Sequence, residues 1–115
     1  MAKKLLLVAG FMLATYPVQA AQNVEKGKSL YINHCAPCHG LDGSGNGEAG
    51  AHLSPPPADL REALQNSIIS DEYLMWTIRE GGQNVHTQMP AFETEGTIDG
   101  NDAKDIIHYL WQAFK

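Results

Sequence analysis

Two cysteines and a histidine stand at a spacing that can hold one cofactor. Residues 35–39 read Cys-Ala-Pro-Cys-His, and Cys35 and Cys38 are the only two cysteines of the 115-residue chain. Two thiols three positions apart can each form a thioether with one vinyl group of a single haem, and C-x-x-C-H is typical of that attachment. His39 would lie beneath the iron as its proximal ligand. We therefore predict one covalently bound haem c on this pentad.

The same residues allow other chemistry. A cysteine pair at this spacing can form a redox disulfide or half of a zinc site, but two cysteines are too few for a four-thiolate zinc site or an iron–sulfur cluster. A Cys₂His₂ site using His34 or His39 would lack the usual ligand spacing. A thioredoxin-like site is expected near a βαβ pattern, and the chain shows no strand pattern. Haem is favoured, and a copper or zinc carrier is the remote alternative.

A second axial ligand is expected far along the chain. Met89 lies in the polar stretch 83–92, and Pro90 biases its backbone toward an extended form that presents the thioether outward. Methionine and histidine together are an axial pair found in cytochromes. His86, three residues earlier, is the rival ligand. Met75 has the right atom type but falls at helical spacing, where methionine is usually core.

Two predicted helices must position the pentad. The first covers 23–33, with Asn23 as its N-cap, and delivers the cysteines. The second covers 99–114, begins at the N-cap Asp99, and carries an apolar stripe. Gly27 would let another backbone approach closely, so we predict that the two helices cross there. The stripe consists of Ala103, Ile106, Leu110 and Phe114, and the facing residues are Val24, Gly27 and Tyr31.

The segment after the pentad is predicted to be loop. Residues 41–51 contain four glycines, and their partial match to a calcium loop fails at position twelve, where Leu53 replaces the glutamate. Three prolines make residues 54–60 extended. A ligating histidine usually donates its second ring nitrogen to a carbonyl. We expect the carbonyl of Pro56 or Pro57 to accept that hydrogen bond, with Leu60 packed on the haem.

Two further helices are predicted between the prolines and Met89. A short one covers 61–67, and a longer one begins at the N-cap Ser70 and stops at Gly81 and Gly82. Side chains near the end of the longer helix could reach the haem propionates. The candidates are Trp76, Arg79 and Gln83, with no choice among them.

The first twenty residues are predicted to be a signal peptide. Lys3 and Lys4 precede an apolar run over 5–14, and small residues before Ala20 suit cleavage after it. The alternative is an uncleaved anchor, but the run is shorter than the roughly 20 residues that span a bilayer. Since no second such run follows, we expect a soluble periplasmic protein.

Charge and length restrict the partners. Cleavage would leave residues 21–115 as a single domain of 95 residues with 6 basic and 13 acidic side chains, a net charge of −7. Such a surface should not bind nucleic acid. It should be steered toward redox proteins with basic docking patches, the more strongly at low salt. We expect a monomer.

Together these motifs resemble class I cytochrome c, the small, single-haem type with His and Met ligands, in its bacterial periplasmic form. The resemblance covers nearly all of the chain after the signal peptide. It implies an all-α fold wrapped round the haem, with crossing terminal helices and an iron saturated by His39 and Met89. It departs from mitochondrial members in being short and acidic. The residues that carry it are Gly27, Tyr31, Cys35, Cys38, His39, Leu60, Met89, Pro90, Ile106, Tyr109 and Leu110.

The resemblance implies outer-sphere electron transfer and no enzymatic activity. The leading hypothesis is a soluble carrier of single electrons between a dehydrogenase or respiratory complex and a terminal oxidase or reductase. One alternative is a subunit permanently bound in a dehydrogenase or reductase complex, for which the apolar flank around Trp111 and Phe114 is the feature to examine. The other is a haem sensor or peroxidase-like protein whose sixth iron position is open.

Overall fold

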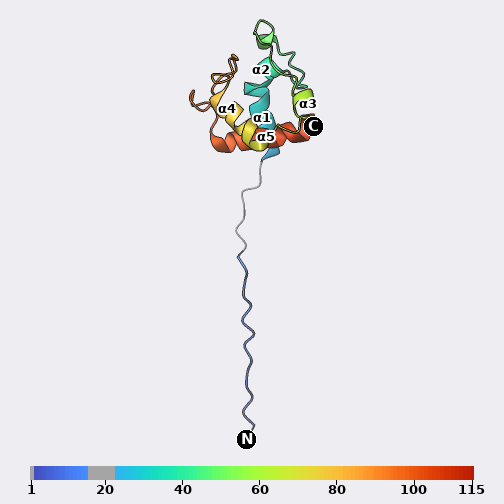
Figure 1. Ribbon diagram of the computed structural model, residues 1–115. Coiled ribbons are helices and arrows are strands. Elements are labelled where there is room, and N and C mark those ends of the chain that lie inside the picture. Colours follow the sequence, from blue (N-terminus) through green and yellow to red (C-terminus); the bar gives the residue numbers. More distant parts are fainter. Residues whose placement is uncertain (1, 16–22) are drawn as a thin grey trace.

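The computed structural model describes residues 2–15 and 23–115, and the second range forms a helical domain without strands (Figure 1). This confirms the predicted all-α class. Helices α1 and α5 lie together at one end of the domain, α2 follows α1, and α3 and α4 flank this pair. The helices are α1 (Val24–His34), α2 (Ala36–His39), α3 (Leu60–Ala63), α4 (Asp71–Glu80) and α5 (Gly100–Phe114), with a 3₁₀ turn, η1 (Glu48–Gly50).

Helices α1 and α5 cross at Gly27, as predicted. A Cβ built on Gly27 would overlap the backbone carbonyl of Asp105, so only glycine permits this approach. Polar contacts fix the same crossing: the Asn23 backbone N–H donates to Asp105 Oδ1 over 2.9 Å, and Lys26 Nζ lies 2.7 Å from Asp102 Oδ1. These contacts fix the position of α1 relative to α5 along the part of α1 that precedes the pentad.

The predicted N-caps are confirmed. The Asn23 side chain accepts the N–H of Lys26 at the start of α1, and Ser70 accepts that of Tyr73 at the start of α4. Asp99 and Asp102 form a reciprocal capping box on α5. These caps satisfy N–H groups that have no partner inside the helix.

The core joins α1, α4 and α5. Tyr31, Leu64, Ile98 and Ile106 are fully buried, and the Tyr31 hydroxyl donates a 2.6 Å hydrogen bond to the Gly40 carbonyl. The predicted α5 stripe is buried at Ala103, Ile106 and Leu110. Phe114 at its end is half-buried and packs on Tyr31. The Tyr31 hydrogen bond ties this core to the chain just after the pentad.

Helix α3 is shorter than the predicted 61–67. It ends at Ala63, after which Gln65 and Asn66 donate to carbonyls only three residues back. The Asn66 side chain then accepts the N–H of Ile68. Asparagine competes in this way with the helical pattern, which explains the early end.

Residues 2–15 adopt no helix or strand and are exposed. The predicted cleavage position after Ala20 lies outside the described residues, as do residues 21 and 22 of the predicted domain. Within the described ranges, no helix is both long enough and apolar enough to cross a membrane.

Candidate haem site

The pentad forms a tight helical turn directly on the end of α1. Cys35 closes α1 by donating its N–H to the Tyr31 carbonyl, and its own carbonyl accepts the N–H of His39 over 2.8 Å. Both thiols are free. Cys35 is 8% exposed, Cys38 is half-buried, and burial raises the pKa of the Cys35 thiol to about 12. The two thiols and the imidazole are thus held on one short turn, with Cys35 protonated.

The His39 ring is oriented by a backbone carbonyl. Nδ1 lies 3.0 Å from the carbonyl oxygen of Ala58. A carbonyl can only accept, so Nδ1 carries the proton and Nε2 has a free lone pair, as an iron ligand requires. The prediction of Pro56 or Pro57 was wrong by one or two residues. The Pro57 carbonyl instead lies against Gly45, where a Cβ would come within 2.6 Å of it.

The glycine-rich loop packs on the backbone of the pentad. Gly45 N–H donates to the His39 carbonyl over 2.7 Å, and Gly47 N–H donates to that of Cys38 over 3.0 Å. A Cβ on Gly47 would overlap the Pro37 carbonyl. The predicted loop is confirmed except at η1 (Glu48–Gly50), which is a short regular turn. Several of its glycines are buried against the site instead of lying in solvated turns.

Met89 and its rival His86 have different surroundings. Met89 is half-buried and packs against the hydrophobic core, and its carbonyl accepts the Gly82 N–H over 3.0 Å. His86 is exposed and has a left-handed backbone, with φ of 56°. Of the two side chains, Met89 is therefore the one already in contact with the apolar interior. Met75 also packs against the core, as expected for a helical methionine.

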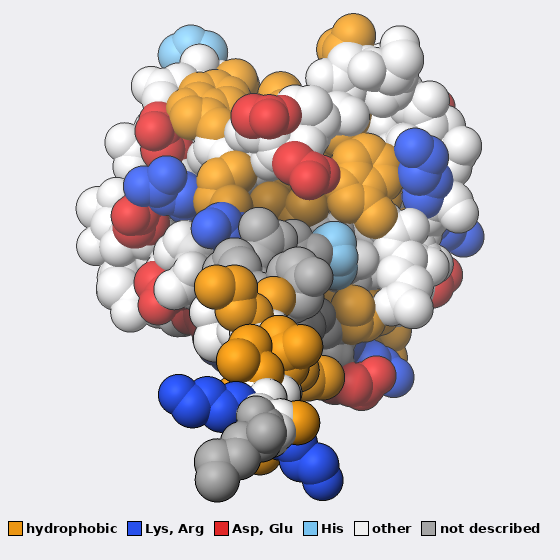
Figure 2. Space-filling view, turned by 90° about the horizontal axis from the view of Figure 1, so that it is seen from below, with side chains coloured by type: hydrophobic (Ala, Val, Ile, Leu, Met, Phe, Trp, Pro, Cys, Tyr) orange, Lys and Arg blue, Asp and Glu red, His pale blue; other side chains and the backbone are white. Residues whose placement is uncertain are grey.

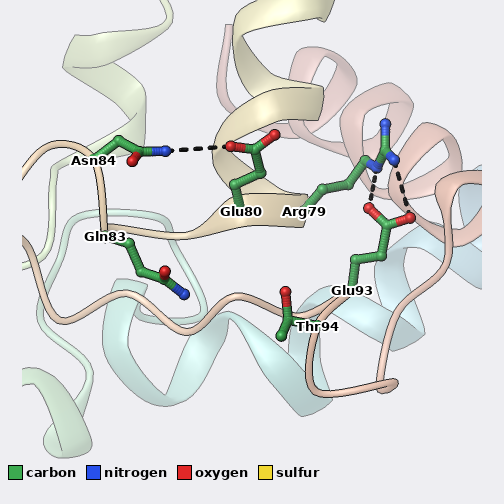
Figure 3. Close-up of a pocket in the computed structure, with 6 residues that line it drawn as sticks. All are labelled: Arg79, Glu80, Gln83, Asn84, Glu93 and Thr94. Atoms are coloured by element: carbon green, nitrogen blue, oxygen red, sulfur yellow. Dashed lines mark hydrogen bonds and ion pairs between the residues drawn. The ribbon is translucent and has the colours of Figure 1, made fainter.

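The loop that carries Met89 is fastened to the end of α4 (Figure 3). Arg79 forms a two-pronged ion pair with Glu93, with one arm at 2.9 Å, and Glu93 N–H donates to the Arg79 carbonyl. Hydrogen bonding to Arg79 holds the pKa of Glu93 below its usual range. Gln83 and Thr94 complete the polar hollow drawn there. Sequence analysis missed Glu93, because its partner lies fourteen residues away and no local pattern joins them.

The three candidates for propionate contacts are placed differently. Arg79 is engaged by Glu93, and Trp76 Nε1 donates to Glu80 over 2.8 Å. Glu80 also accepts from Asn84. Gln83 is exposed. Two of the three donors thus already have carboxylate partners.

The surroundings suit a large apolar cofactor. Apolar side chains at the edge of the core are only partly covered, and among the described residues no buried side-chain nitrogen or oxygen lacks a partner. No group of three or more His, Cys, Asp or Glu in the described part of the chain is placed to hold a metal ion. The partly covered apolar residues include Leu30, Leu60, Ile69, Met75 and Met89.

Comparison with known proteins agrees with this chemistry. A family model described as cytochrome c oxidase, cbb3-type, subunit III matches residues 22–110. The chain belongs to this family of c-type cytochrome domains. The cofactor of such domains is a covalently bound haem c, and their role is electron transfer.

Two relatives with a region similar to this chain are longer proteins. It is 29% identical over 98 residues to the cbb3-type cytochrome c oxidase subunit FixP of Bradyrhizobium diazoefficiens, a match that covers 85% of this chain and 30% of FixP. It is 42% identical over 38 residues to a thiosulfate dehydrogenase of Stutzerimonas stutzeri, covering 33% of this chain and 12% of that protein. The chain therefore spans less than a third of either relative.

Proposed function

We propose that this cytochrome domain is a soluble periplasmic carrier of single electrons, of the class I type. Cys35 and Cys38 hold one haem through thioethers, and His39 and Met89 are the axial ligands. The observation that carries the proposal is the 3.0 Å contact between His39 Nδ1 and the Ala58 carbonyl, directly after two free thiols. This hydrogen bond leaves the lone pair of Nε2 free to bind iron and fixes the orientation of the ring.

Each residue has a separate task. The thiols of Cys35 and Cys38 would hold the cofactor covalently, each through a thioether to one vinyl group. His39 is oriented by Ala58, and Met89, which packs against the core, would supply its thioether as the second iron ligand. When bound, haem iron supplies a site that alternates between the ferrous and ferric states. With both axial positions filled, no position is left for a substrate, so we propose no enzymatic activity.

The proposed partners are redox proteins with basic docking patches. After removal of residues 1–20 at Ala20, the chain would carry a net charge of −7. On the face shown in Figure 2, acidic, basic and apolar side chains are interspersed. Steering would then come from the summed charge more than from one acidic patch on this face. A dehydrogenase or respiratory complex would supply the electrons, and a terminal oxidase or reductase would accept them.

Residues at the α5 flank favour a free monomeric carrier over a permanently bound subunit. Trp111 is half-buried, and its Nε1 donates to Asp71 over 2.6 Å. Phe114 packs on Tyr31 and Tyr109. Both aromatic side chains therefore make their main contacts within the domain and are partly buried there. The FixP relationship keeps the subunit alternative open, since FixP is an oxidase subunit.

The proposal is tested on protein exported with haem-maturation factors. We expect a haem that stays attached after denaturation, and that denaturation releases from the double variant Cys35→Ser/Cys38→Ser, which has no thioether. The protein should be a monomer that several donors reduce. N-terminal sequencing should begin at Ala21. Ready carbon monoxide binding to the reduced protein would instead support the open-site sensor. Stability only in complex with a dehydrogenase or oxidase would support the subunit role, and a haem-free product would overturn the proposal.

A further inference from the structure

We propose that Gly45 and Arg61 are positioning residues for His39, because together they hold the Ala58 carbonyl against the imidazole. This rests on the proposed role of His39 as the proximal ligand. Neither residue touches the ring, so each would act through the backbone segment that ends in Ala58.

Gly45 lies between the two backbone segments that meet at His39. Its N–H donates to the His39 carbonyl over 2.7 Å. On its other side, a Cβ would come within 2.6 Å of the Pro57 carbonyl and 3.3 Å of the Ala58 carbonyl. Its φ of +83° is also in the left-handed region that favours glycine. Any side chain here must therefore displace the Pro57 carbonyl, and with it the adjoining Ala58 peptide, or break the bond to His39.

Arg61 joins the same two segments by charge. Its Nε and Nη2 donate to the Asp59 carboxylate over 3.1 and 2.9 Å, and its Nη1 lies 3.9 Å from Asp42 Oδ2. Asp59 follows Ala58 directly, and Asp42 belongs to the glycine-rich loop. Asp42 is itself fixed, because it accepts the Ser44 N–H over 3.0 Å.

A backbone hydrogen bond closes the assembly between these residues. Leu60 N–H donates to the Gly43 carbonyl over 2.6 Å. The Asp42 and Asp59 carboxyls both have a pKa below their usual range, with a hydrogen bond as the main cause in each case. The glycine-rich loop thus contacts this segment through Gly45 at Pro57, through the Asp42–Arg61 pair, and through the Gly43–Leu60 hydrogen bond. Because Arg61 is exposed, its contribution should be smaller than that of Gly45.

The hydrogen bond to Ala58 should set the electron density on the imidazole. Donation from Nδ1 to a carbonyl makes the ring a more basic ligand, which favours ferric iron. Loosening that hydrogen bond should therefore raise the reduction potential and expose the Nδ1 proton to solvent. A change in overall stability alone can also speed exchange, through opening of the fold, so the midpoint potential is the reading that distinguishes the two causes.

The test compares three variants of the haem-loaded protein. We measure the solvent exchange rate of the His39 Nδ1 proton by NMR in the reduced state, and the midpoint potential. Gly45→Ala should speed exchange about tenfold, as expected if a hydrogen bond worth roughly 1.4 kcal/mol is lost, and should raise the potential. Arg61→Lys keeps the charge but loses the two-pronged bond, and should shift both readings in the same directions by less.

Gly96→Ala is the matched control. Gly96 has a φ of +71° but no atom within 4 Å of a built Cβ, so it shares the backbone strain without the overlap. Wild-type values for both readings in Gly45→Ala and Arg61→Lys would overturn the inference while leaving the c-type spectrum, and hence the proposed function, intact. If Gly45→Ala does not fold, Arg61→Lys decides alone. A wild-type protein without a c-type spectrum would overturn the proposed function first.

Discussion

The segments around the two predicted iron ligands, His39 at the end of α2 and Met89 in its loop, are fixed in different ways. Around His39, the ring itself is hydrogen-bonded to Ala58, and the amides of Gly45 and Gly47 bind the pentad carbonyls. Around Met89, packing against the core and one backbone hydrogen bond from Gly82 hold the residue, and residues 83–88 are all exposed. In Figure 1 the glycine-rich loop (41–51) and the segment that carries Met89 (83–92) lie on opposite sides of α2.

The difference shows two ways to hold a ligand. A hydrogen bond to the backbone can fix the side chain itself, or side-chain packing and ion pairs can fix the segment that carries it. The histidine side is fixed by glycines that tolerate no Cβ, whereas the methionine side is closed by an exposed ion pair between Arg79 and Glu93. Exposed ion pairs are weak and screened by salt. The Met89 ligation should therefore be the first to give way when the protein is perturbed.

The largest loss of stability should come from disrupting the packing of the glycine-rich loop on the pentad. In Gly47→Ala, the added Cβ overlaps the carbonyls of Pro37 and Ala36, so we expect a loss of about 1–3 kcal/mol in the free energy of unfolding. Guanidinium denaturation of the haem-loaded protein measures it. Gly100→Ala is the control, because nothing lies within 4 Å of its built Cβ. Equal stability of the two variants would contradict the described packing.

A smaller loss of stability should come from a change at the start of α4, the helix that leads into the Met89 loop. Trp111→Phe keeps the aromatic ring but removes the 2.6 Å hydrogen bond to Asp71. We expect a loss of about 0.5–1.5 kcal/mol in the free energy of unfolding, the usual range for one hydrogen bond. Wild-type stability of Trp111→Phe would show that this hydrogen bond does not stabilise the fold.

Glu93→Gln should loosen the methionine side without touching the histidine side. Losing the charge-assisted bond to Arg79 should raise the affinity of the ferric protein for added imidazole by about threefold, because an exposed pair contributes little. Optical titration measures the affinity. Glu95→Gln is the matched control, since no ion pair of Glu95 is found in the described residues. Equal affinities in both variants would show that the ion pair does not hold the loop.

Acid should also weaken the Met89 side before the His39 side. The pKa of Glu93 is lowered in the folded protein, so its stabilising effect is complete above the ordinary carboxyl pKa of about 4.3 and is lost as pH falls through the depressed folded value. We expect Met89 ligation in the wild type to weaken in that acid range, by the same small factor as in Glu93→Gln. An acid titration should show no such Glu93-dependent step in Glu93→Gln; an identical titration curve would contradict the assignment.

Much of this arrangement could be predicted because local rules fix it. The caps Asn23, Ser70 and Asp99, and the crossing at Gly27, follow from residue type and spacing. The pentad spacing predicted the cofactor chemistry without any tertiary information. The identity of Met89 as the distal ligand is still a prediction from its loop position.

What escaped prediction depends on contacts between distant segments. The choice of Ala58 over Pro57 is decided by how closely Gly45 packs on the proline segment. The pairing of Arg79 with Glu93 needs the chain reversal between them. Neither contact has a periodic or compositional signature, so only a three-dimensional structure could provide it.

The most direct test of the central claim is the visible and near-infrared spectrum of wild type and Met89→Ala, oxidised and reduced. Ligation by His39 and Met89 predicts narrow c-type bands and a weak ferric sulfur-to-iron band in the wild type. Only the sulfur-to-iron band and the filled sixth position should be lost in the variant, with haem still attached. A wild-type spectrum without that band, unchanged by the substitution, would contradict the account and assign the sixth position to His86 or leave it open.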